Sequence, residues 1–284
     1  MKYFSIFSGI GGFDLPLNNN GHECVGYSEI DKYAIQIYKK NFGEKVINYG
    51  DATKINSKEL PNFDLLVGGF PCQAFSLAGK RQGFNDTRGT LFFEIARILK
   101  DKKPRHFLLE NVKGLLSHEN GRTFKIIIST LNELGYDVQW LVFNSKQYGT
   151  PQNRERVLFI GHFREECGRK IFPFGFKNKR FNEKNSINNI FCVAERGRYG
   201  DDGKIIQCLE PRFDGVSNTL TSVEKDNKLF LNGRLRRFTP IECERLQGFP
   251  DNWTEGISDS QRFKCLGNAV TTKIIDKIIK EVFL

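Results

Sequence analysis

The stretch that decides the fold runs from residue 3 to residue 13 and reads Tyr3-Phe-Ser-Ile-Phe-Ser-Gly-Ile-Gly-Gly-Phe13. The apolar run Tyr3–Phe7 predicts a strand that ends in a glycine-rich turn and opens into a helix. Glycines at positions 9, 11 and 12 let a ligand approach the backbone, and a helix N-terminus offers free N–H groups. By itself the pattern is as typical of a structural turn as of a cofactor site.

Downstream of this turn, short β-like runs alternate with helical stretches through the first 160 residues. The predicted strands are Tyr3–Phe7, Glu23–Ser28, Phe63–Val67, His106–Leu109, Val138–Phe143 and Val157–Ile160, and the predicted helices include Asp31–Asn41, Leu91–Leu99 and Thr123–Leu134. Such alternation predicts an α/β fold, a Rossmann-like doubly wound sheet with parallel pairing and helices on both faces. Sheets of this class bind ligands at the carboxyl ends of their strands.

The alternation breaks down from about Cys167, where turn-rich sequence replaces the helical period. We expect a catalytic and cofactor-binding domain over 1–166, a small, irregular, mostly β domain over 167–237, and a return to the first domain over 238–284. The return begins with Thr239–Gln247, which resembles a helix N-cap followed by proline. A closing helix, Ala269–Phe283, carries an isoleucine stripe that we expect to pack on the first sheet.

The charge of the chain points to a polyanionic partner. Its 284 residues include 43 Lys and Arg against 33 Asp and Glu, a net charge of +10. Between Cys167 and Arg237 there are 15 basic and 8 acidic residues, so this quarter of the chain carries +7. A basic excess concentrated in one segment favours nucleic acid as the partner.

Cysteine usage and hydropathy exclude other classes. Seven cysteines, the closest pair 16 residues apart, and four scattered histidines predict neither a disulfide framework nor a metal site. We therefore expect a protein of a reducing cytoplasm. The longest uncharged stretch, Leu65–Gly79, is too short and too polar to span a bilayer, and the amino-terminal run is expected to be a strand rather than a signal peptide.

Acidic residues follow two of the early strands. Glu29 comes just after the second predicted strand, where a carboxylate would accept hydrogen bonds from a ribose diol. Asp51 follows what we expect to be another strand, in Gly50-Asp-Ala52. With the glycine turn, these strand-end features favour a nucleoside cofactor, and the missing GxGxxG pattern speaks against a dinucleotide.

Two further strand ends carry reactive side chains. Cys72 lies in Gly68-Gly-Phe-Pro-Cys-Gln-Ala-Phe-Ser76, among loop-forming residues, which makes it a nucleophile candidate rather than a buried small hydrophobe. Glu110, in Glu-Asn-Val after His106–Leu109, either caps the next helix or faces the Cys72 cleft as a general acid.

A third feature is the segment Gln152-Asn-Arg-Glu-Arg156. Alternate residues of an extended segment share one face, so Gln152, Arg154 and Arg156 are expected to point together. They form either ordinary surface charge or a clamp for an anion or a carbonyl group.

The chain resembles the cytosine-5 DNA methyltransferases in four motifs and in their order. These motifs are the glycine loop, the cysteine of Pro-Cys-Gln, the glutamate of Glu-Asn-Val and the Gln-x-Arg-x-Arg segment. Two late motifs of that family are also similar: Arg237-Phe-Thr-Pro-Ile-Glu-Cys-Glu-Arg-Leu-Gln-Gly-Phe-Pro-Asp251 and Gly267-Asn-Ala-Val270. The resemblance covers the chain except about 167–237, and is strongest to the compact bacterial enzymes of restriction–modification systems. It implies a mixed, methyltransferase-type sheet and a target recognition domain in the variable segment.

The resemblance implies a reaction and its catalytic residues. Cys72 would add to carbon 6 of a cytosine, so that carbon 5 attacks the methyl group of S-adenosylmethionine. Glu110 would hold N3 and the exocyclic amine, Arg156 the carbonyl oxygen of the base, and Arg154 would support the pocket. No metal is implied.

The resemblance also implies a cofactor pocket. Glu29 would bind the ribose and Asp51 would lie near the adenine amine, while Ile30 stands where the family often has an adenine-stacking aromatic. The predicted cofactor-binding residues are Phe7, Gly9, Ile10, Gly11, Gly12, Glu29, Ile30, Asp51, Ala52, Pro71, Leu91, Asn268 and Val270.

The partner implied is duplex DNA, with the target base flipped out and a loop at about Ala74–Thr90 closing over it. The predicted DNA-binding residues are Gln73, Ser76, Lys80, Arg81, Arg88, Arg196, Arg198, Thr219 and Leu220. Arg196 and Arg198 either read guanines or contact phosphates. A monomer is expected, with a cognate restriction endonuclease as its functional partner.

Two alternatives remain open. A tRNA cytosine methyltransferase would share the catalytic domain, although the basic variable segment favours DNA. A catalytically inactive DNA-binding module is the other, and it is disfavoured because Cys72, Glu110, Arg154 and Arg156 are all present.

Overall fold

The computed structural model describes residues 1–71, 91–167, 190–199, 204–222 and 227–284. The strands are β1 (Lys2–Ile6), β2 (Glu23–Ser28), β3 (Leu65–Gly69), β4 (His106–Val112), β5 (Tyr136–Asn144), β6 (Gln152–Asn153), β7 (Glu155–Phe163), β8 (Ile190–Tyr199), β9 (Ile205–Arg212), β10 (Ser217–Asn218), β11 (Asn227–Leu231) and β12 (Arg234–Arg237). The α-helices are α1 (Asp14–Asn19), α2 (Lys32–Phe42), α3 (Leu91–Lys102), α4 (Arg122–Glu133), α5 (Arg164–Cys167), α6 (Pro240–Gln247), α7 (Asp259–Asn268) and α8 (Thr272–Ile278). Short 3₁₀ helices are η1 (Ala52–Lys54), η2 (Ser57–Glu59), η5 (Lys113–Leu116), η6 (His118–Gly121) and η7 (Ser145–Gln147), and a short π-helix is η9 (Ile279–Phe283).

The larger domain is built on a six-stranded sheet in the order β2-β1-β3-β4-β7-β5. Strands β1 to β4 pair in parallel, as predicted, but β7 runs antiparallel to both β4 and β5. The parallel pairing predicted from strand–helix alternation is therefore wrong for β7, and the mixed sheet implied by the resemblance is confirmed. A parallel return needs a crossover of about a dozen residues or more, and the segment 145–154 between β5 and β7 is too short for one.

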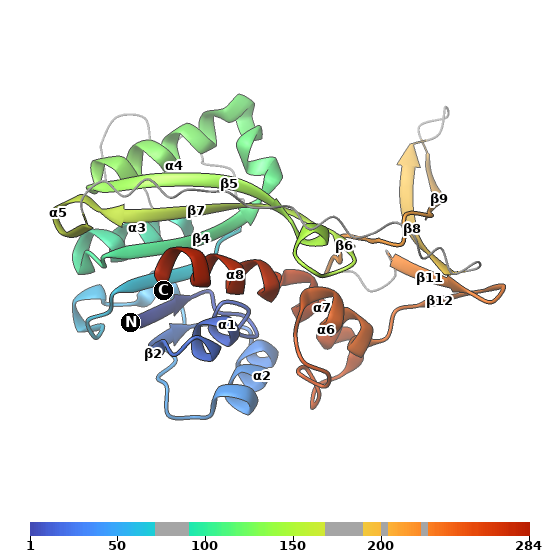
Figure 1. Cartoon of the computed structure of the whole chain (residues 1–284), viewed down its shortest axis with the longest axis horizontal. Helices are drawn as coiled ribbons and strands as arrows, with labels where there is room; N and C mark the ends of the chain where they lie inside the picture. The colour runs from blue at the N-terminus through green and yellow to red at the C-terminus, as the bar shows by residue number, and fades with distance from the viewer. Residues whose placement is uncertain (72–90, 168–189, 200–203, 223–226) are drawn as a thin grey trace.

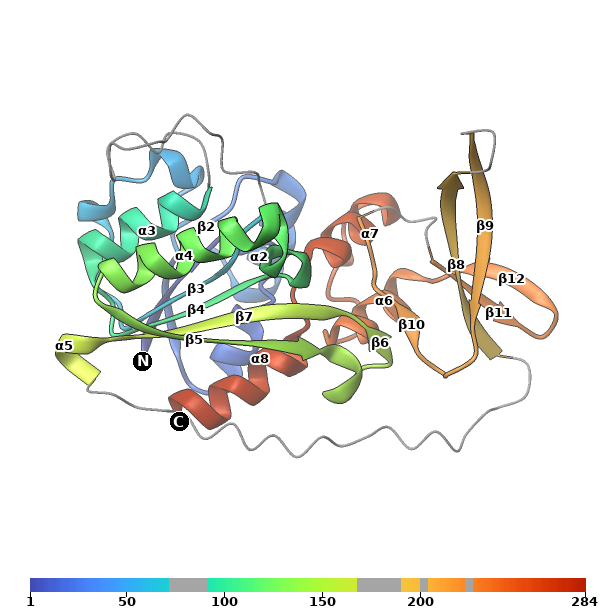
Figure 2. The same cartoon turned by 90° about the horizontal axis from the view of Figure 1, so that it is seen from above.

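Helices cover both faces of this sheet, which confirms the doubly wound class (Figures 1 and 2). On one face α3 and α4 bury Ile95 and Ile127 against Leu66. On the other face Leu17 of α1 joins the α8 side chains against Tyr3 of β1. Packing of this kind holds the strand ends in fixed positions relative to one another.

The predicted isoleucine stripe does pack on the sheet, through Ile274, Ile275, Ile278 and Ile279. The helix that carries it begins at Thr272 rather than at Ala269, because Ala269 is extended, with φ −69° and ψ 150°. This extended link follows α7. The predicted cap is confirmed: the Thr239 side chain and Glu242 form a capping box, with Pro240 at the start of α6.

The second domain contains a four-stranded antiparallel sheet in the order β12-β11-β8-β9. Its described part is β, as predicted, and more regular than the turn-rich sequence indicated. Strand β10 is not part of this sheet and pairs in parallel with β6 of the larger domain. The β6–β10 pair therefore lies between the two domains (Figure 2). The domain boundaries themselves stay a prediction.

The segment before Asp51 is not a strand of the sheet, so this part of the prediction is wrong. It contributes an isolated bridge between Tyr27 and Asn48, and Asp51 then accepts a hydrogen bond from the backbone N–H of Thr53 to cap η1. The short apolar run before Asp51 is compatible with either a strand or a loop. In the structure it is a loop that lies beside β2. Within the residues that the structure describes, no helix is long and apolar enough to cross a membrane.

Candidate functional site

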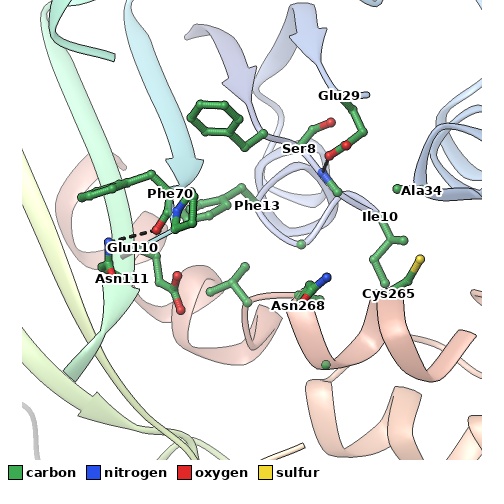
Figure 3. Close-up of a pocket in the computed structure, with 18 of the residues that line it drawn as sticks. Ser8, Ile10, Phe13, Glu29, Ala34, Phe70, Glu110, Asn111, Cys265 and Asn268 are labelled. Carbon is green, nitrogen blue, oxygen red and sulfur yellow. Dashed lines mark hydrogen bonds between the residues drawn. The ribbon is translucent and has the colours of Figure 1, made fainter. Parts of the chain in front are cut away.

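The carboxyl ends of β1, β2, β3 and β4 meet at one edge of the sheet, where the chain leaves a cavity of about 420 Å³. Its wall combines residues that follow these four strands with residues from the carboxyl-terminal part of the chain (Figure 3). The described lining residues are Phe7, Ser8, Gly9, Ile10, Gly12, Phe13, Glu29, Asp31, Ala34, Gly69, Phe70, Pro71, Glu110, Asn111, Val112, Arg154, Arg156, Cys265, Gly267, Asn268, Ala269 and Val270. Parallel strand ends place ligands in this position generally.

The glycine loop between β1 and α1 forms the floor of one end of the cavity. A Cβ at Gly12 would lie 2.7 Å from Cγ1 of Val270, so a glycine is required where the loop meets the opposite wall. A Cβ at Gly11 would instead meet the ring of Phe42 at 2.2 Å, on the side of α2. Gly11 therefore serves the packing of the loop on α2 rather than the cavity surface.

Glu29 lies at the same end, held by backbone groups. Its Oε2 accepts a hydrogen bond of 2.8 Å from the N–H of Gly9 (Figure 3). Its Oε1 accepts bonds of 2.8 Å from the N–H groups of Ile30 and Asp31. These three donors fix the orientation of the carboxylate. A carboxylate has about four acceptor positions, so one remains for a ligand hydroxyl group.

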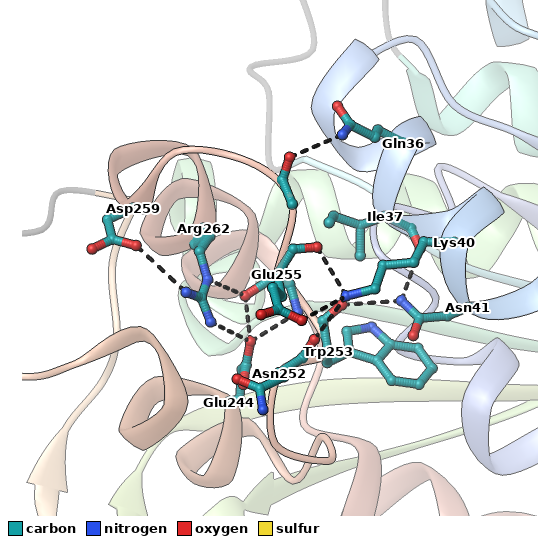
Figure 4. A network of polar contacts seen from close by, with 12 residues as sticks. Gln36, Ile37, Lys40, Asn41, Glu244, Asn252, Trp253, Glu255, Asp259 and Arg262 are labelled. Carbon is teal, nitrogen blue, oxygen red and sulfur yellow. Dashed lines mark hydrogen bonds and ion pairs between the residues drawn. The ribbon is translucent and has the colours of Figure 1, made fainter.

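The opposite wall, residues 265–270, comes from the end of α7 and the extended link. It is tied to the amino-terminal part of the chain: Nε1 of Trp253 donates to the carbonyl of Ile10 at 2.9 Å, and Nζ of Lys264 lies 2.7 Å from Oδ2 of Asp31. Figure 4 shows further bonds from α2 to the segment before α7, among them Nζ of Lys40 to the carbonyl of Asn252 at 3.1 Å. The cavity is thus closed by residues more than 200 positions apart in sequence.

At the other end of the cavity, Glu110 and Arg156 form an ion pair. Their strands β4 and β7 are neighbours, and Nε of Arg156 lies 2.8 Å from Oε1 of Glu110. Both side chains are nearly buried, 12% and 13% exposed. Burial raises the pKa of Glu110, while the nearby charges of Arg156 and Arg154 oppose this rise. A carboxyl group of this kind keeps its proton to higher pH than an exposed one and can donate it to a buried ligand.

Asn111, for which the sequence predicted no role, fixes the backbone just before Cys72. Its Nδ2 donates to the carbonyl of Phe70 at 2.9 Å, and the side chain is buried. Pro71 lines the cavity. Cys72 itself lies outside the described residues, as do Gln73, Ser76, Lys80, Arg81 and Arg88.

The three alternate residues expected to share one face take different partners. Arg156 faces Glu110, whereas Gln152 and Arg154 are buried among backbone groups of other segments. Arg154 donates to the carbonyls of Leu220, Gly267 and Ala269 at 2.8 to 3.1 Å. Burial lowers its pKa to about 9, with repulsion from Arg156 as a further cause, so it stays charged at neutral pH.

Among the predicted cofactor residues, those that the structure brings to the cavity are Phe7, Gly9, Ile10, Gly12, Glu29, Pro71, Asn268 and Val270. Five other predicted cofactor residues do not line the cavity within the part of the chain that the structure describes: Gly11, Ile30, Asp51, Ala52 and Leu91. Ile30 is 72% exposed, and the carbonyl of Ala52 accepts a hydrogen bond from Arg97.

The lining also includes residues that were not among the cofactor-binding residues predicted one by one: Ser8, Phe13, Asp31, Ala34, Asn111 and Cys265. Ser8 and Phe13 lie within the glycine-rich loop that the sequence predicts at the cofactor, so their place in the lining could be predicted from the neighbouring glycines. Ala34 and Cys265 carry no signal of their own, because an alanine in a helix and a cysteine in a helix are both typical of a core.

The predicted DNA-binding residues of the second domain are described in part. Thr219 and Leu220 follow β10, and Oγ1 of Thr219 donates to the carbonyl of Asn153 at 2.7 Å. Arg196 and Arg198 belong to β8, but their side chains are outside the described part. No group of three His, Cys, Asp or Glu side chains that could hold a metal occurs within the described ranges.

Comparison with solved structures gives the class of the fold. The chain superposes on a DNMT2 variant from Spodoptera frugiperda with a TM-score of 0.72 at 22% identity, covering 100% of this chain and 99% of that one. Likeness at this identity concerns the fold alone, and it supports the mixed α/β sheet with a smaller β domain.

Sequence comparison is more specific. The family model of the C-5 cytosine-specific DNA methylases matches residues 1–205 and 177–284, and the chain belongs to this family. It is 42% identical to Type II methyltransferase M1.ScrFI of Lactococcus lactis subsp. cremoris over 99% of this chain and 77% of that protein. It is 37% identical to Type II methyltransferase M.HhaI of Haemophilus parahaemolyticus over 98% of this chain and 93% of that protein. The enzyme is a DNA cytosine-5 methyltransferase.

Proposed function

We propose that this enzyme transfers the methyl group of S-adenosylmethionine to carbon 5 of a cytosine flipped out of duplex DNA, with Cys72 as the nucleophile. The observation that carries the proposal is the continuous cavity that runs from Glu29 to the Glu110–Arg156 pair. A methyl transfer requires cofactor and base to meet in one enclosed space, and this cavity supplies suitable groups for both.

The residues at the Glu29 end fit a nucleoside cofactor. The oriented Glu29 carboxylate suits a ribose diol, and Oγ of Ser8 is buried on the cavity wall without a hydrogen-bond partner among the described residues. A buried hydroxyl group without a partner is costly, which a polar ligand atom would remedy. We therefore assign Glu29 to the ribose, and the wall of Asn268 and Val270 to the rest of the cofactor.

When bound, S-adenosylmethionine supplies a methyl group made electrophilic by its sulfonium. Carbon 5 of cytosine is a weak nucleophile, and a thiolate that adds to carbon 6 makes it an enamine carbon able to attack. Cys72 supplies that thiolate in our proposal. Loss of the proton from carbon 5 after transfer expels the thiolate and restores the ring.

The Glu110–Arg156 pair supports the base. Glu110, with its raised pKa, donates to N3 and compensates the charge that develops as Cys72 adds. The guanidinium of Arg156 holds the carbonyl oxygen of the base. Its Nε lies 2.8 Å from Oε1 of Glu110, and this contact fixes the orientation of the two side chains relative to each other. Asn111 fixes the carbonyl of Phe70, two residues before Cys72.

The second domain supplies the DNA contacts in this proposal. Its basic excess attracts phosphates irrespective of sequence. Base flipping costs a few kcal/mol, which these contacts offset. Arg196 and Arg198 are assigned to guanine or phosphate contacts, and Thr219 and Leu220 to the surroundings of the flipped base.

The similar bacterial proteins are named Type II methyltransferases. We infer from this likeness that the enzyme acts on a short duplex sequence and protects it against a cognate restriction endonuclease. The endonuclease is a functional partner, acting on the same sites without binding this chain.

The proposal is tested by incubating the purified chain with S-adenosylmethionine and either unmethylated plasmid DNA or tRNA. Bisulfite sequencing of the plasmid should reveal complete methylation of cytosine within one short sequence, absent with Cys72→Ser. Methylation of tRNA with an unmodified plasmid would contradict the proposal, as would full activity of the Cys72→Ser variant.

A further inference from the structure

Four buried polar side chains lie between the second domain and the wall of the cavity. Gln152, Arg154, Gln247 and Thr271, which we call the polar hub, are each at most 2% exposed. They come from three separate segments: the stretch of β6 and the residue after it, the last residue of α6, and the N-cap of α8. Burial of this much polar surface is costly unless every group serves a contact.

On one side, the hub holds the second domain by its backbone. Oε1 of Gln152 accepts from the N–H of Leu220 at 3.0 Å, and Arg154 donates to the carbonyl of the same residue at 2.9 Å. Both main-chain groups of Leu220 are therefore bound by the larger domain. The pairing of β10 with β6 places this segment in register.

On the other side, the hub holds the wall of the cavity. Arg154 donates to the carbonyls of Gly267 and Ala269, and Nε2 of Gln247 donates to those of Leu266 and Ala269, at 2.7 to 3.3 Å. These carbonyls flank Asn268, which lines the cavity. A shift of this wall by about an ångström would break several of these bonds, because hydrogen bonds weaken steeply outside their usual range.

The two sides are joined inside the hub. Oε1 of Gln247 accepts from Oγ1 of Thr271 at 2.9 Å and from Nε2 of Gln152 at 3.5 Å. Direct packing reinforces the link: a Cβ at Gly267 would lie 2.1 Å from the carbonyl oxygen of Thr221. With no side chain at Gly267, the backbone of the second domain rests on the backbone of the cavity wall.

We propose that the polar hub couples occupancy of the cofactor cavity to the position of the second domain, with Gln247 as the positioning residue. The inference rests on the proposed function, in which the cavity takes the cofactor and the second domain binds DNA. A ligand that orders the wall at 266–269 then also orders the Leu220 segment, so each ligand tightens the binding of the other by the same factor.

The test measures the affinity for S-adenosylhomocysteine by calorimetry, with and without a duplex oligonucleotide that carries the sequence mapped by bisulfite sequencing. We expect the wild type to bind S-adenosylhomocysteine about tenfold more tightly with DNA, within the usual range for coupled sites. In Gln247→Met, of similar size, this ratio should fall below about threefold, whatever the change in the affinity measured without DNA. The reciprocal ratio, measured on DNA affinity, should fall equally.

The matched control is Gln36→Met, the same substitution at a glutamine that bonds the carbonyl of Gly256 at 3.0 Å (Figure 4). That contact joins α2 to the carboxyl-terminal part and does not involve the second domain, so this variant should keep the wild-type ratio. If Gln247→Met fails to fold, Thr271→Val decides, since it deletes one hydroxyl bond, with Thr271→Ser expected to restore the coupling.

The outcomes separate this inference from the proposed function. A folded Gln247→Met or Thr271→Val that keeps the tenfold ratio overturns the role of the hub, and so does a wild type that methylates DNA but shows no coupling. A wild type that neither binds S-adenosylhomocysteine nor methylates plasmid DNA overturns the proposed function instead.

Discussion

Replacing Glu110 by glutamine removes a proton while keeping the shape of the side chain. The amide oxygen can still accept from Nε of Arg156, 2.8 Å away in the native pair. What disappears is the ability to give a proton to N3 of the base, a contribution of about 10²- to 10⁴-fold for general acids. This corresponds to about 3 to 5 kcal/mol in the barrier.

The assay is single-turnover methyl transfer from labelled S-adenosylmethionine to a target duplex, together with the Kd for that duplex. We expect the rate to fall by about 10²- to 10⁴-fold. The Kd should change less than about threefold, because in our proposal Glu110 contacts only the flipped base, whereas the basic second domain binds the phosphates. The control is Glu155→Gln, the same substitution one residue from Arg156, which should leave the rate unchanged. The exposed ion pair of Glu155 with Lys113 contributes at most about 1 kcal/mol to stability.

The pH profile adds a second readout. Because burial raises the pKa of Glu110 in the folded enzyme, the acid form is present below that pKa and is lost as the pH rises through it. The wild-type rate should therefore decline on the alkaline side, and this decline should be missing in Glu110→Gln. Equal losses of rate and DNA affinity in the variant would contradict the role of Glu110 as a general acid and indicate a structural role.

Three further predictions concern the nucleophile, the glycine loop and the buried core. Cys72→Ser should abolish turnover and leave S-adenosylhomocysteine binding intact by calorimetry; retained turnover would remove Cys72 from the mechanism. Gly12→Ala should weaken that binding by more than about tenfold, since its Cβ would lie 2.7 Å from Val270, whereas Gly114→Ala, with open space around it, should not; equal affinities would exclude the loop from the site. Asp14 is fully buried and its pKa is raised by burial from 3.8 to about 6, so the wild type should lose about 3 kcal/mol of unfolding free energy as the pH rises from about 4 to above 6. Asp14→Asn should lack this loss in urea titrations, and parallel pH profiles of the two proteins would contradict the assignment.

Much of the site followed from sequence because its residues lie directly after strands. Glu29, Pro71 and Glu110 each follow or end an apolar run, and the parallel pairing of the strands brings them to one edge. Asn268 and Val270 came from the resemblance of a short motif. No local pattern shows that residues more than 200 positions away close the same cavity.

The parts that sequence missed depend on tertiary contacts. Arg154 and Arg156 look equivalent in an extended segment, yet one binds three backbone carbonyls and the other a carboxylate. The partners of Arg154 come from the end of α7, the link after it and the Leu220 segment, and the partner of Arg156 comes from β4, all distant in sequence. The antiparallel direction of β7 likewise follows from the length of its connection, which strand–helix alternation does not reveal.

Gln247 illustrates the same limit. In sequence it is one polar residue at the end of an amphipathic helix, where exposure to solvent is the ordinary expectation. In the structure it is fully buried and bonds four groups from three segments. Burial of a helix-terminal amide is a property of the assembled fold, because only the packing of α7 and the β6 segment supplies its partners.

The most direct test of the central claim uses duplex DNA in which 5-fluorocytosine replaces cytosine, incubated with the enzyme and S-adenosylmethionine. Fluorine at carbon 5 cannot be lost as a proton is, so the enzyme should remain covalently attached to the DNA through Cys72. A denaturation-resistant adduct should form with the wild type and none with Cys72→Ser. An enzyme that binds this DNA and forms no adduct, or forms one equally well with Cys72→Ser, would contradict the role of Cys72 as the nucleophile.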